Sequence, residues 1–422
     1  MKLDGSSVRV PQRAWYGDTK LELRFPRRWD VKVHRMNGHG MTRISDAGIR
    51  EALAKPIGGK TIAELAKGRK QAVIIFDDIY RPTPIYRIVP FVLNELARGR
   101  IKEDRIRFVA GNGAHRLMDR QDFIKKLGEE IIERFFVFNH NVYDHTVELG
   151  NTSRGTPVAI NEQVMECDLK IGIGGVLPAR TAGFGGGGKI ILPGVSSIDT
   201  IKHNHINIAG LGPGKIAPET VSMGRVKDNV MRLDVEETTR MAGLDVKIDA
   251  VLNSSREIVG LFAGDPVLEH RNASAFAKDV YATKPSENMD IVVANSYPLE
   301  HEPFRGYWTC DSVKLGGDVV IIDQGPSGIL PSLMYSRFGM KFGGPGWSDK
   351  TNPVTAKAKR IIVFSQEFHR ADEPNFGGLD RAIFLKSWRE VIEELNNNNP
   401  GKAKVAVYPY STMQCPPLPE DW

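Results

Sequence analysis

Short apolar runs rich in β-branched residues alternate with longer amphipathic stretches along the first half of the chain. The short runs predict strands at 71–76, 105–111 and 166–178. The amphipathic stretches predict helices near 84–98 and over 119–135. Strands that alternate with helices in this way are typical of α/β proteins with a mostly parallel sheet.

The same alternation starts again after about residue 284. It predicts, in order, strands at 290–298, 316–325 and 360–366, a helix over 378–397 and a strand at 404–409. The segment 282–288 is polar and contains a proline, so we place a domain boundary there. We therefore expect two α/β domains, residues 1–283 and residues 284–422, each with a mostly parallel sheet flanked by helices.

Composition and charge narrow the class of ligand. The chain has 422 residues, of which 41% are hydrophobic and 26% are charged, and these shares are ordinary for a soluble globular protein. The net charge is +6, but the lysines and arginines are scattered and form no block of like charge. We read this excess as favouring an anionic small molecule over nucleic acid.

Cysteine usage and hydropathy bear on the cellular compartment. The three cysteines lie far apart and form no CxxC pair, which argues against a disulfide framework or a zinc ribbon. The N-terminus lacks an apolar core of signal-peptide length, and no run of about 18 apolar residues occurs. We expect a cytoplasmic protein with no membrane segment, and the sequence leaves its oligomeric state open.

Two polar clusters follow predicted strands, where open α/β sheets place their ligands. DDIYRPTP (77–84) follows the first strand, and GNGAHR (111–116) follows the second. The first cluster also fits a helix N-cap with proline in the first turn. The second would bring His115 to the edge of the sheet as a candidate acid or base, although a single histidine in a turn is more often structural.

The segment ARTAGFGGGGKIILPG (179–194) is harder to explain as a simple turn. A Walker phosphate loop needs Ser or Thr after its lysine, but Ile190 follows Lys189. A dinucleotide fingerprint fits poorly too, because no acidic residue follows at the expected distance. A flexible linker is the plain alternative, yet linkers are seldom followed at once by such an apolar run. Lys189 is therefore a candidate covalent attachment point or anion contact.

Sixteen residues after Lys189, His205 is a candidate ligand for a soft or borderline metal ion. His203 lies two residues earlier, and two histidines with this spacing cannot share a helical face. We therefore expect at most one of them to bind metal.

The order of five motifs resembles the nickel-pincer lactate racemase family. These motifs are DD-x-x-RPTP, GNGAHR, AGFGGGGK-x-I-x-PG, TI-x-x-NH and VLNSSREIVGLFAGD (251–265). The resemblance covers roughly residues 10 to 270 and is weaker beyond them. It implies a nickel-pincer nucleotide, derived from a pyridinium dicarboxylate, whose two sulfur donors hold a nickel ion.

The resemblance also implies roles for individual residues. Lys189 matches the lysine that links the nucleotide covalently, and His205 matches the histidine that completes nickel coordination. His115 matches one of two catalytic histidines, and Asp78 and Arg81 match an acidic and a basic residue of the same site. Gly186, Gly187 and Gly188 would then lie against the nucleotide, where side chains would collide with it and backbone amides can face its phosphate.

The implied chemistry explains these residue types. The C–H bond of a 2-hydroxy acid is too weakly acidic for easy proton abstraction, and hydride transfer to the pincer avoids a carbanion. A base must then accept the hydroxyl proton, and an imidazole of near-neutral pKa suits that step. The resulting planar 2-keto acid can accept hydride on either face. The resemblance places this active site in an interdomain cleft, with the second domain contributing to the substrate pocket.

The sequence departs from the family at two places. Ala179 stands where the racemases have their second catalytic histidine, and alanine cannot transfer a proton. In a looser alignment, Arg305 and Trp308 replace a glutamine and a lysine that face the substrate. We therefore expect a 2-hydroxy acid that is larger or more polar than lactate, such as a sugar acid, with its carboxylate paired to Arg305 or Arg81.

Three readings remain open. The first is a racemase or 2-epimerase in which Arg180, His203 or His301 supplies the second acid or base. The second is a pincer-dependent oxidoreductase that needs only one base. The third is a protein without catalytic activity that binds the cofactor, and the presence of His115 argues against it. In all three, the enzymes that build the cofactor are expected partners.

Overall fold

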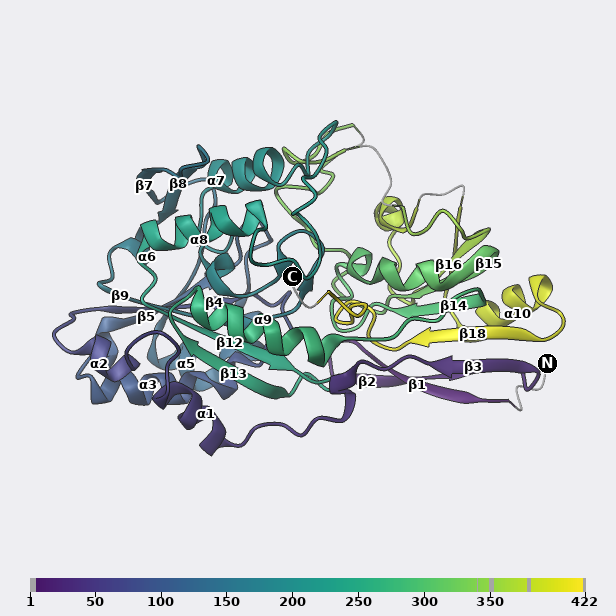
Figure 1. Cartoon of the computed structure of the whole chain (residues 1–422), viewed down its shortest axis with the longest axis horizontal. Coiled ribbons are helices and arrows are strands. Elements are labelled where there is room, and N and C mark those ends of the chain that lie inside the picture. Colours follow the sequence, from purple (N-terminus) through teal and green to yellow (C-terminus); the bar gives the residue numbers. More distant parts are fainter. Residues whose placement is uncertain (1–4, 340, 349–352, 378–380, 420–422) are drawn as a thin grey trace. The chain divides into compact units, whose positions relative to one another are not determined.

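The computed structural model describes residues 5–339, 341–348, 353–377 and 381–419 (Figure 1). The chain divides into two compact units. The larger unit comprises Gly40–Val280, Pro331–Ser348 and Pro419–Trp422. The smaller unit comprises Met1–His39, Tyr281–Leu330 and Asp349–Leu418.

The larger unit is built on a six-stranded sheet with the order β13-β12-β9-β4-β5-β6. Its strands are β4 (Ala72–Asp77), β5 (Ile106–Gly111), β6 (Phe136–Asn139), β9 (Leu169–Gly175), β12 (Val246–Leu252) and β13 (Ile258–Gly264). All neighbouring pairs are parallel except β12 and β13. Every residue of β4 is buried, because both faces of the sheet are covered, and this burial explains its uninterrupted apolar sequence.

Helices and short hairpins cover both faces of this sheet. The helices are α1 (Asp46–Ala54), α2 (Ile62–Ala66), α3 (Val89–Arg98), α4 (Arg120–Leu127), α5 (Glu129–Arg134), α6 (Glu162–Met165), α7 (Ile198–Lys202), α8 (Val230–Ala242) and α9 (Leu268–Tyr281). The hairpins pair β7 (Thr146–Asn151) with β8 (Pro157–Asn161) and β10 (Pro178–Ala179) with β11 (Gly183–Phe184). On one face, Phe76 of β4 packs against Phe123 of α4. On the other face, Val73 and Ile75 belong to a core that includes Ile190.

The smaller unit contains a six-stranded, fully parallel sheet with the order β17-β16-β15-β14-β18-β3. Its strands are β3 (Trp29–Val33), β14 (Met289–Asn295), β15 (Val313–Ile322), β16 (Arg360–Phe364), β17 (Ala382–Leu385) and β18 (Ala403–Tyr408). One face packs against α10 (Trp388–Asn398) and the hairpin of β1 (Ser7–Gln12) and β2 (Thr19–Arg24). The other face packs against two 3-10 helices, η6 (Pro303–Ser312) and η7 (Arg370–Phe376). The predicted α/β class, with mostly parallel sheets flanked by helices, is confirmed.

Two predicted helices differ from the observed elements. The stretch 119–135 forms two helices, because Gly128 has a φ of +91° and ends α4. Of the helix predicted over 378–397, residues 378–380 lie outside the described residues. Residues 382–385 form β17 instead, since they pair in parallel with β16, and α10 begins at Trp388 after a capping box at Ser387.

The two units exchange segments in a way that the sequence pattern does not indicate. The predicted boundary at 283/284 lies close to Tyr281, where the chain enters the smaller unit. Residues 1–39 were expected in the first domain, but they belong to the smaller unit, because β3 pairs with β18. The segment Pro331–Ser348 returns to the larger unit, where the Leu333 amide donates to the Ala114 carbonyl at 2.7 Å.

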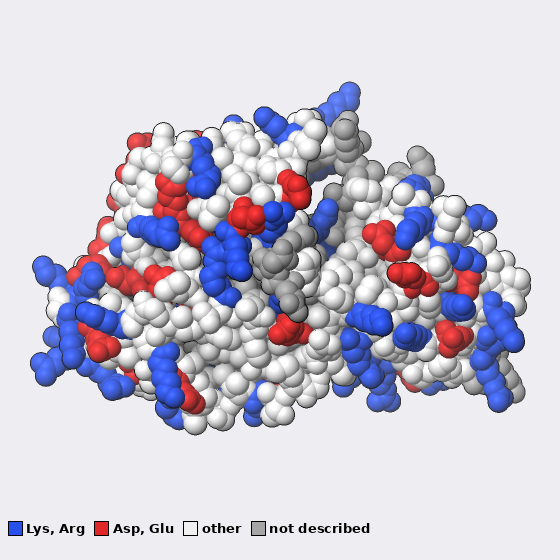
Figure 2. Space-filling view, in the orientation of Figure 1, with Lys and Arg blue, Asp and Glu red and all other residues white. Residues whose placement is uncertain are grey.

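Charges on the visible surface are mixed. On the face shown in Figure 2, lysines and arginines are interspersed with aspartates and glutamates. Among the described residues, no helix is both long enough and apolar enough to cross a membrane.

Candidate active site

The carboxyl ends of three adjacent strands of the larger unit carry the residues that the sequence singled out. Strand β4 leads into Asp78, β5 leads into His115, and β9 leads into the glycine loop before Lys189. The order β9-β4-β5 places β4 between the other two. The chain runs from β4 to β5 on one side and later returns to β9 on the other, so this edge is a topological switch point.

Asp78 and His115 form a buried pair. The His115 Nδ1 atom lies 2.6 Å from Asp78 Oδ2, and the Asp78 side chain is 2% exposed. Burial alone would raise the pKa of this carboxyl group, but the charge and hydrogen bond of His115, with the charge of Arg81, hold it below its usual value. An ionised carboxylate can only accept a hydrogen bond, so the His115 Nδ1 atom carries the proton that it donates to Asp78. In the neutral imidazole the lone pair is then at Nε2.

Tyr80 and Arg116 pack around this pair. The Tyr80 ring meets the His115 ring edge to face at 5.7 Å. The Tyr80 hydroxyl accepts a hydrogen bond from Arg116 Nε at 2.9 Å, and Arg116 pairs with Asp122 at 2.7 Å. His115 is therefore restrained on two sides, by a carboxylate and by an aromatic ring.

Arg81 lies in the turn that follows Asp78. Its backbone amide donates to the Asp78 carbonyl at 3.0 Å, and its guanidinium Nη1 donates to the Tyr80 carbonyl at 3.0 Å. Lys126, which is fully buried on α4, donates to the carbonyls of Arg81 and Thr83 and to Asp77 Oδ1 at 2.5 Å. Lys126 thus holds the turn that carries Arg81.

Side chains from three other elements hold the glycine loop in place. The buried Arg232 of α8 donates to the carbonyls of Ala182, Phe184 and Gly186. The Gly187 amide donates to Asp249 of β12 at 2.6 Å. His270 of α9 donates from Nε2 to the Gly185 carbonyl at 2.8 Å.

The glycines at 186, 187 and 188 are required by the protein's own packing. A Cβ atom at Gly186 would lie 2.6 Å from Asp249 Oδ2, and one at Gly187 would lie 2.6 Å from His270 Cγ. A Cβ atom at Gly188 would lie 2.2 Å from Thr239 Oγ1. Packing within the protein therefore explains why glycine occupies these three positions, and the sequence analysis did not anticipate this reason. The contact of these glycines with a nucleotide stays a prediction.

Lys189 follows this loop and lies in the 3-10 helix η4 (Gly187–Ile190). His205 lies in η5 (His203–Ile208), a π-helical segment that continues from α7. Burial and the positive charges of Lys189 and His115 lower the pKa of His205 to about 3. The three side chains are thus close enough to interact electrostatically.

The tautomer of His205 follows from its hydrogen bond to a backbone carbonyl. Its Nδ1 atom lies 3.1 Å from the Ile201 carbonyl, which can only accept, so Nδ1 carries the proton. The neutral ring then has its lone pair at Nε2, the form in which histidine binds metals. His203 instead pairs through Nδ1 with Thr156 Oγ1 at 2.9 Å.

The remaining predicted residues lie on other segments of the chain. Arg180 is exposed beside the buried Ala179 of β10. Arg305 and His301 belong to the smaller unit, where Arg305 Nε donates to Glu302 at 2.7 Å. Trp308 donates from its indole nitrogen to the Gln414 carbonyl and packs against Tyr408.

Sequence reasoning missed Arg232, Asp249 and Lys126. Asp249 lies in a fully buried strand and Arg232 in a largely buried helix, and this pattern was the available signal, whereas most residues of α4 around Lys126 are not buried. Their partners are mostly backbone carbonyls and amides far away in the sequence, so the pattern alone could not have assigned their contacts.

A histidine oriented by a carboxylate, beside a lysine and a second histidine, at the switch point of a parallel sheet, defines an α/β enzyme. Residues 16–211, which include all five of the motif-matched residues in the larger unit, match the lactate racemase N-terminal domain. The lactate racemase of Thermoanaerobacterium thermosaccharolyticum is 28% identical over 326 residues, which cover 75% of this chain and 74% of that protein. The lactate racemase of Lactiplantibacillus plantarum is 30% identical over 282 residues, 65% of each chain.

Solved structures show the same fold. The lactate racemase apoprotein of T. thermosaccharolyticum matches with a TM-score of 0.72 at 22% identity, over 97% of this chain and 99% of that one. A Thermotoga maritima protein matches with a TM-score of 0.63 at 15% identity, over 88% and 98%. The chain is therefore similar to lactate racemases over most of its length, carries their N-terminal domain at residues 16–211, and is an enzyme of the isomerase class.

Proposed function

We propose that this protein is a racemase or 2-epimerase of a 2-hydroxy acid that is larger or more polar than lactate. The observation that carries the proposal is the buried Asp78–His115 pair at the carboxyl ends of β4 and β5, on the sheet edge where β9 leads into the loop that ends at Lys189. Similarity to lactate racemases supports the reaction class, and the departures at Ala179 and Arg305 support a substrate other than lactate.

The residues present fit the nickel-pincer nucleotide that the family implies. His205 is neutral and has its Nε2 lone pair available, as a nickel ligand requires. Among the described residues, no group of three His, Cys, Asp or Glu side chains could hold a metal ion. A nickel site at His205 therefore needs donor atoms from a bound group, and Lys189 is the residue that would tether it.

When bound, the nucleotide supplies a hydride acceptor, and the chain's own residues handle the proton. His115 accepts the hydroxyl proton of the substrate at Nε2, because its Nδ1 proton is held by Asp78. The imidazolium that results is stabilised by the buried carboxylate. Arg81 or Arg305 pairs with the substrate carboxylate.

The second acid or base distinguishes the leading function from its alternative. Ala179 is buried and cannot transfer a proton, Arg180 is exposed, and His203 is paired with Thr156. An oxidoreductase needs only the one base, His115, and these observations favour it as the second candidate. A protein that only binds the cofactor would not need the buried Asp78–His115 pair.

Tethering at Lys189 can be tested without a substrate. Protein produced together with the cofactor-building enzymes is expected to contain nickel and to carry an added mass, and Lys189→Ala is expected to remove the added mass. The measurement is intact-protein mass spectrometry with metal analysis. Lys202→Ala, which changes an exposed lysine of α7, is the control and should keep both the nickel and the added mass. Unmodified wild-type protein without nickel would contradict the proposal.

The reaction type can be tested by a screen of 2-hydroxy acids in deuterated water. We expect inversion at C2 of a polar acid, little turnover of lactate, and no net keto acid. Chiral chromatography and keto-acid detection separate the outcomes. Accumulation of keto acid would identify the oxidoreductase, and rapid racemisation of lactate would show that the inference from Ala179 is wrong.

A further inference from the structure

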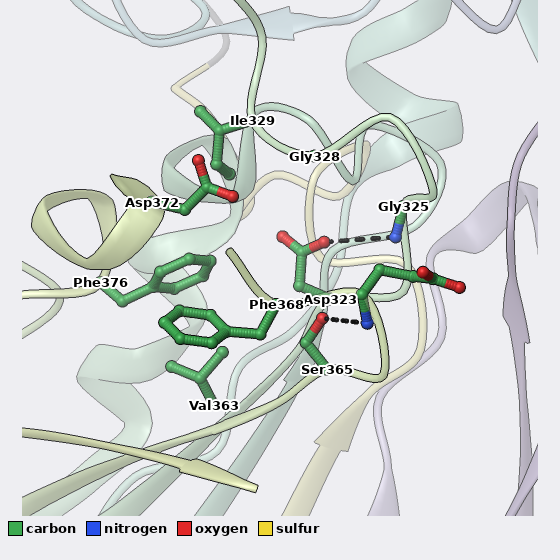
Figure 3. A pocket seen from close by; sticks show the side chains of 10 residues that line it. Asp323, Gly325, Gly328, Ile329, Val363, Ser365, Phe368, Asp372 and Phe376 are labelled. Carbon is green, nitrogen blue, oxygen red and sulfur yellow. Dashed lines mark hydrogen bonds between the residues drawn. The ribbon is translucent and has the colours of Figure 1, made fainter. Parts of the chain in front are cut away.

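The smaller unit contains a pocket at the carboxyl ends of β15 and β16 that the proposed function does not use (Figure 3). Its empty volume of about 260 Å³ consists largely of open solvent, and the enclosed part has room for about one water-sized group. Its lining combines acidic residues, two aromatic rings and aliphatic side chains: Asp323, Asp372, Glu367, Phe368, Phe376 and Ile329.

Asp323 is the acidic group at the base of this pocket. It is 6% exposed, and its Oδ1 atom accepts a hydrogen bond from the Gly325 amide at 3.4 Å. Its Oδ2 atom is buried and has no hydrogen-bond partner among the described residues. A buried carboxylate oxygen without a donor is unfavourable, so this atom is suited to a ligand that supplies one.

The surrounding charges favour a cationic donor. Asp372 faces the same space as Asp323 in Figure 3. Burial and the neighbouring charge of Glu300 raise the pKa of Asp323 well above its usual value. Burial also raises the pKa of Asp372, and the charge of the nearby His369 only partly offsets this rise. A positive ligand would relieve the cost of ionising both carboxyl groups.

Arg13, a cation of the protein itself, pairs with a glutamate of the pocket lining and not with the two aspartates. Arg13 pairs with Glu367 at 2.9 Å, on the exposed side. The Glu300 carboxylate already has donors, because it accepts hydrogen bonds from the backbone amides of Arg13 and Ala14 at 2.5 and 3.0 Å. Among the described residues, no lysine or arginine forms an ion pair with Asp323 or Asp372.

The apolar walls decide between a metal ion and an organic cation. Phe368 and Phe376 lie side by side on one wall of the pocket, with Val363 below them and Ile329 on the rim. A metal ion would gain nothing from these side chains and would need more oxygen ligands than two carboxylates. An alkylammonium group can pair its charge with the carboxylates and place its carbon atoms against the rings.

We propose that this pocket binds the ammonium group of a small aliphatic amine, with Asp323 Oδ2 as the principal acceptor. The enclosed space admits only a head group of about the size of a water molecule, so the carbon stem would lie toward the open mouth. This inference goes beyond the proposed isomerase activity, because it concerns a second ligand class at another sheet.

The test uses the full-length protein without cofactor and measures binding by titration calorimetry. Ethylammonium is expected to bind saturably, while ethanol of similar size and potassium ions bind at least tenfold more weakly. Asp323→Asn keeps the shape of the side chain but removes its charge, and is expected to weaken ethylammonium binding at least tenfold. Asp30→Asn, at an exposed aspartate of β3, is the matched control and should bind as the wild type does.

Folding of the variant is checked by its unfolding temperature without ligand. Asp323→Asn should be at least as stable as the wild type, since it replaces a buried, unpaired carboxyl oxygen. The proposal is overturned by an absence of saturable ethylammonium binding to the wild type. Equal binding of ethanol or of potassium, or unchanged binding by folded Asp323→Asn protein, also overturns it.

Discussion

At the residue scale, the candidate site depends on one short contact. The 2.6 Å hydrogen bond between Asp78 and His115 fixes which imidazole nitrogen faces the reaction. Asp78 is buried yet remains ionised, because His115 and Arg81 compensate its burial. The pair therefore combines orientation with charge stabilisation, and both are needed by a base that accepts a substrate proton.

Replacing Asp78 by Asn should remove the charge and disturb the His115 tautomer. We expect kcat for the preferred hydroxy acid to fall by about 10²–10⁴-fold, the usual contribution of a positioned acid or base. Nitrogen NMR of the His115 ring should show a shift of the proton away from Nδ1. Asp199→Asn, at an exposed aspartate of α7, should change neither quantity. An unchanged His115 tautomer and rate would argue against this role for Asp78.

At the scale of elements, the loop between β9 and η4 is positioned by the helices and strand around it. Arg232, Asp249 and His270 each bind a backbone group of this loop. All three are buried, and burial lowers the pKa of His270 to about 3 and that of Arg232 to about 10. The run of glycines allows these three side chains to approach the backbone closely.

Substitution of Gly187 by Ala should therefore disrupt the loop. Its φ of +56° is unfavourable for alanine, and the added Cβ would lie 2.6 Å from His270 Cγ. We expect a loss of at least about 2 kcal/mol in the free energy of unfolding, from strain and overpacking. Urea unfolding measures this loss, and the fraction of protein modified at Lys189 should fall in parallel. Gly40→Ala, where no atom lies within 4 Å of the new Cβ, should be close to neutral.

At the scale of the whole molecule, each compact unit is built from segments that lie far apart in the sequence. Strand β3 completes the sheet of the smaller unit, and Pro331–Ser348 packs beside Ala114 and His115 in the larger unit. Each unit also contains buried ionisable groups, so the stability of the molecule should depend on pH.

Buried neutral histidines should make the protein less stable in mild acid. Burial lowers the pKa of His140 to about 4, while its unfolded value is about 6.5. Between these values the unfolded chain takes up a proton that the folded chain does not. The stabilisation is therefore complete above about pH 6.5 and is lost as the pH falls toward 4.

The contribution of His140 can be isolated with His140→Gln. The difference in the free energy of unfolding between pH 8 and pH 5 should shrink by about 1–2 kcal/mol, because one titrating group is removed. Asn141→Gln, at an exposed residue of the same segment, removes no titratable group and should leave this difference unchanged. Denaturant titrations at the two pH values provide the measurement. An equal difference in all three proteins would show that His140 does not titrate in this window.

The sequence by itself determined the fold class, the position of seven strands in the two six-stranded sheets, and the family resemblance. Strand periods and motifs are local, so uninterrupted apolar runs predicted β4, β5 and β14, and five motifs in order indicated a lactate racemase relative. It also identified Asp78, His115, Lys189 and His205 as candidates.

Only the tertiary structure decided how these residues are held. Three features depend on partners that are distant in the sequence. They are the role of Arg232 and Asp249, the need for glycine at 186–188, and the strand at 382–385. The same holds for the grouping of residues 1–39 and 331–348. Hydrogen bonds and close packing between remote segments leave no periodic pattern along the chain, and for that reason they become visible only in the folded molecule.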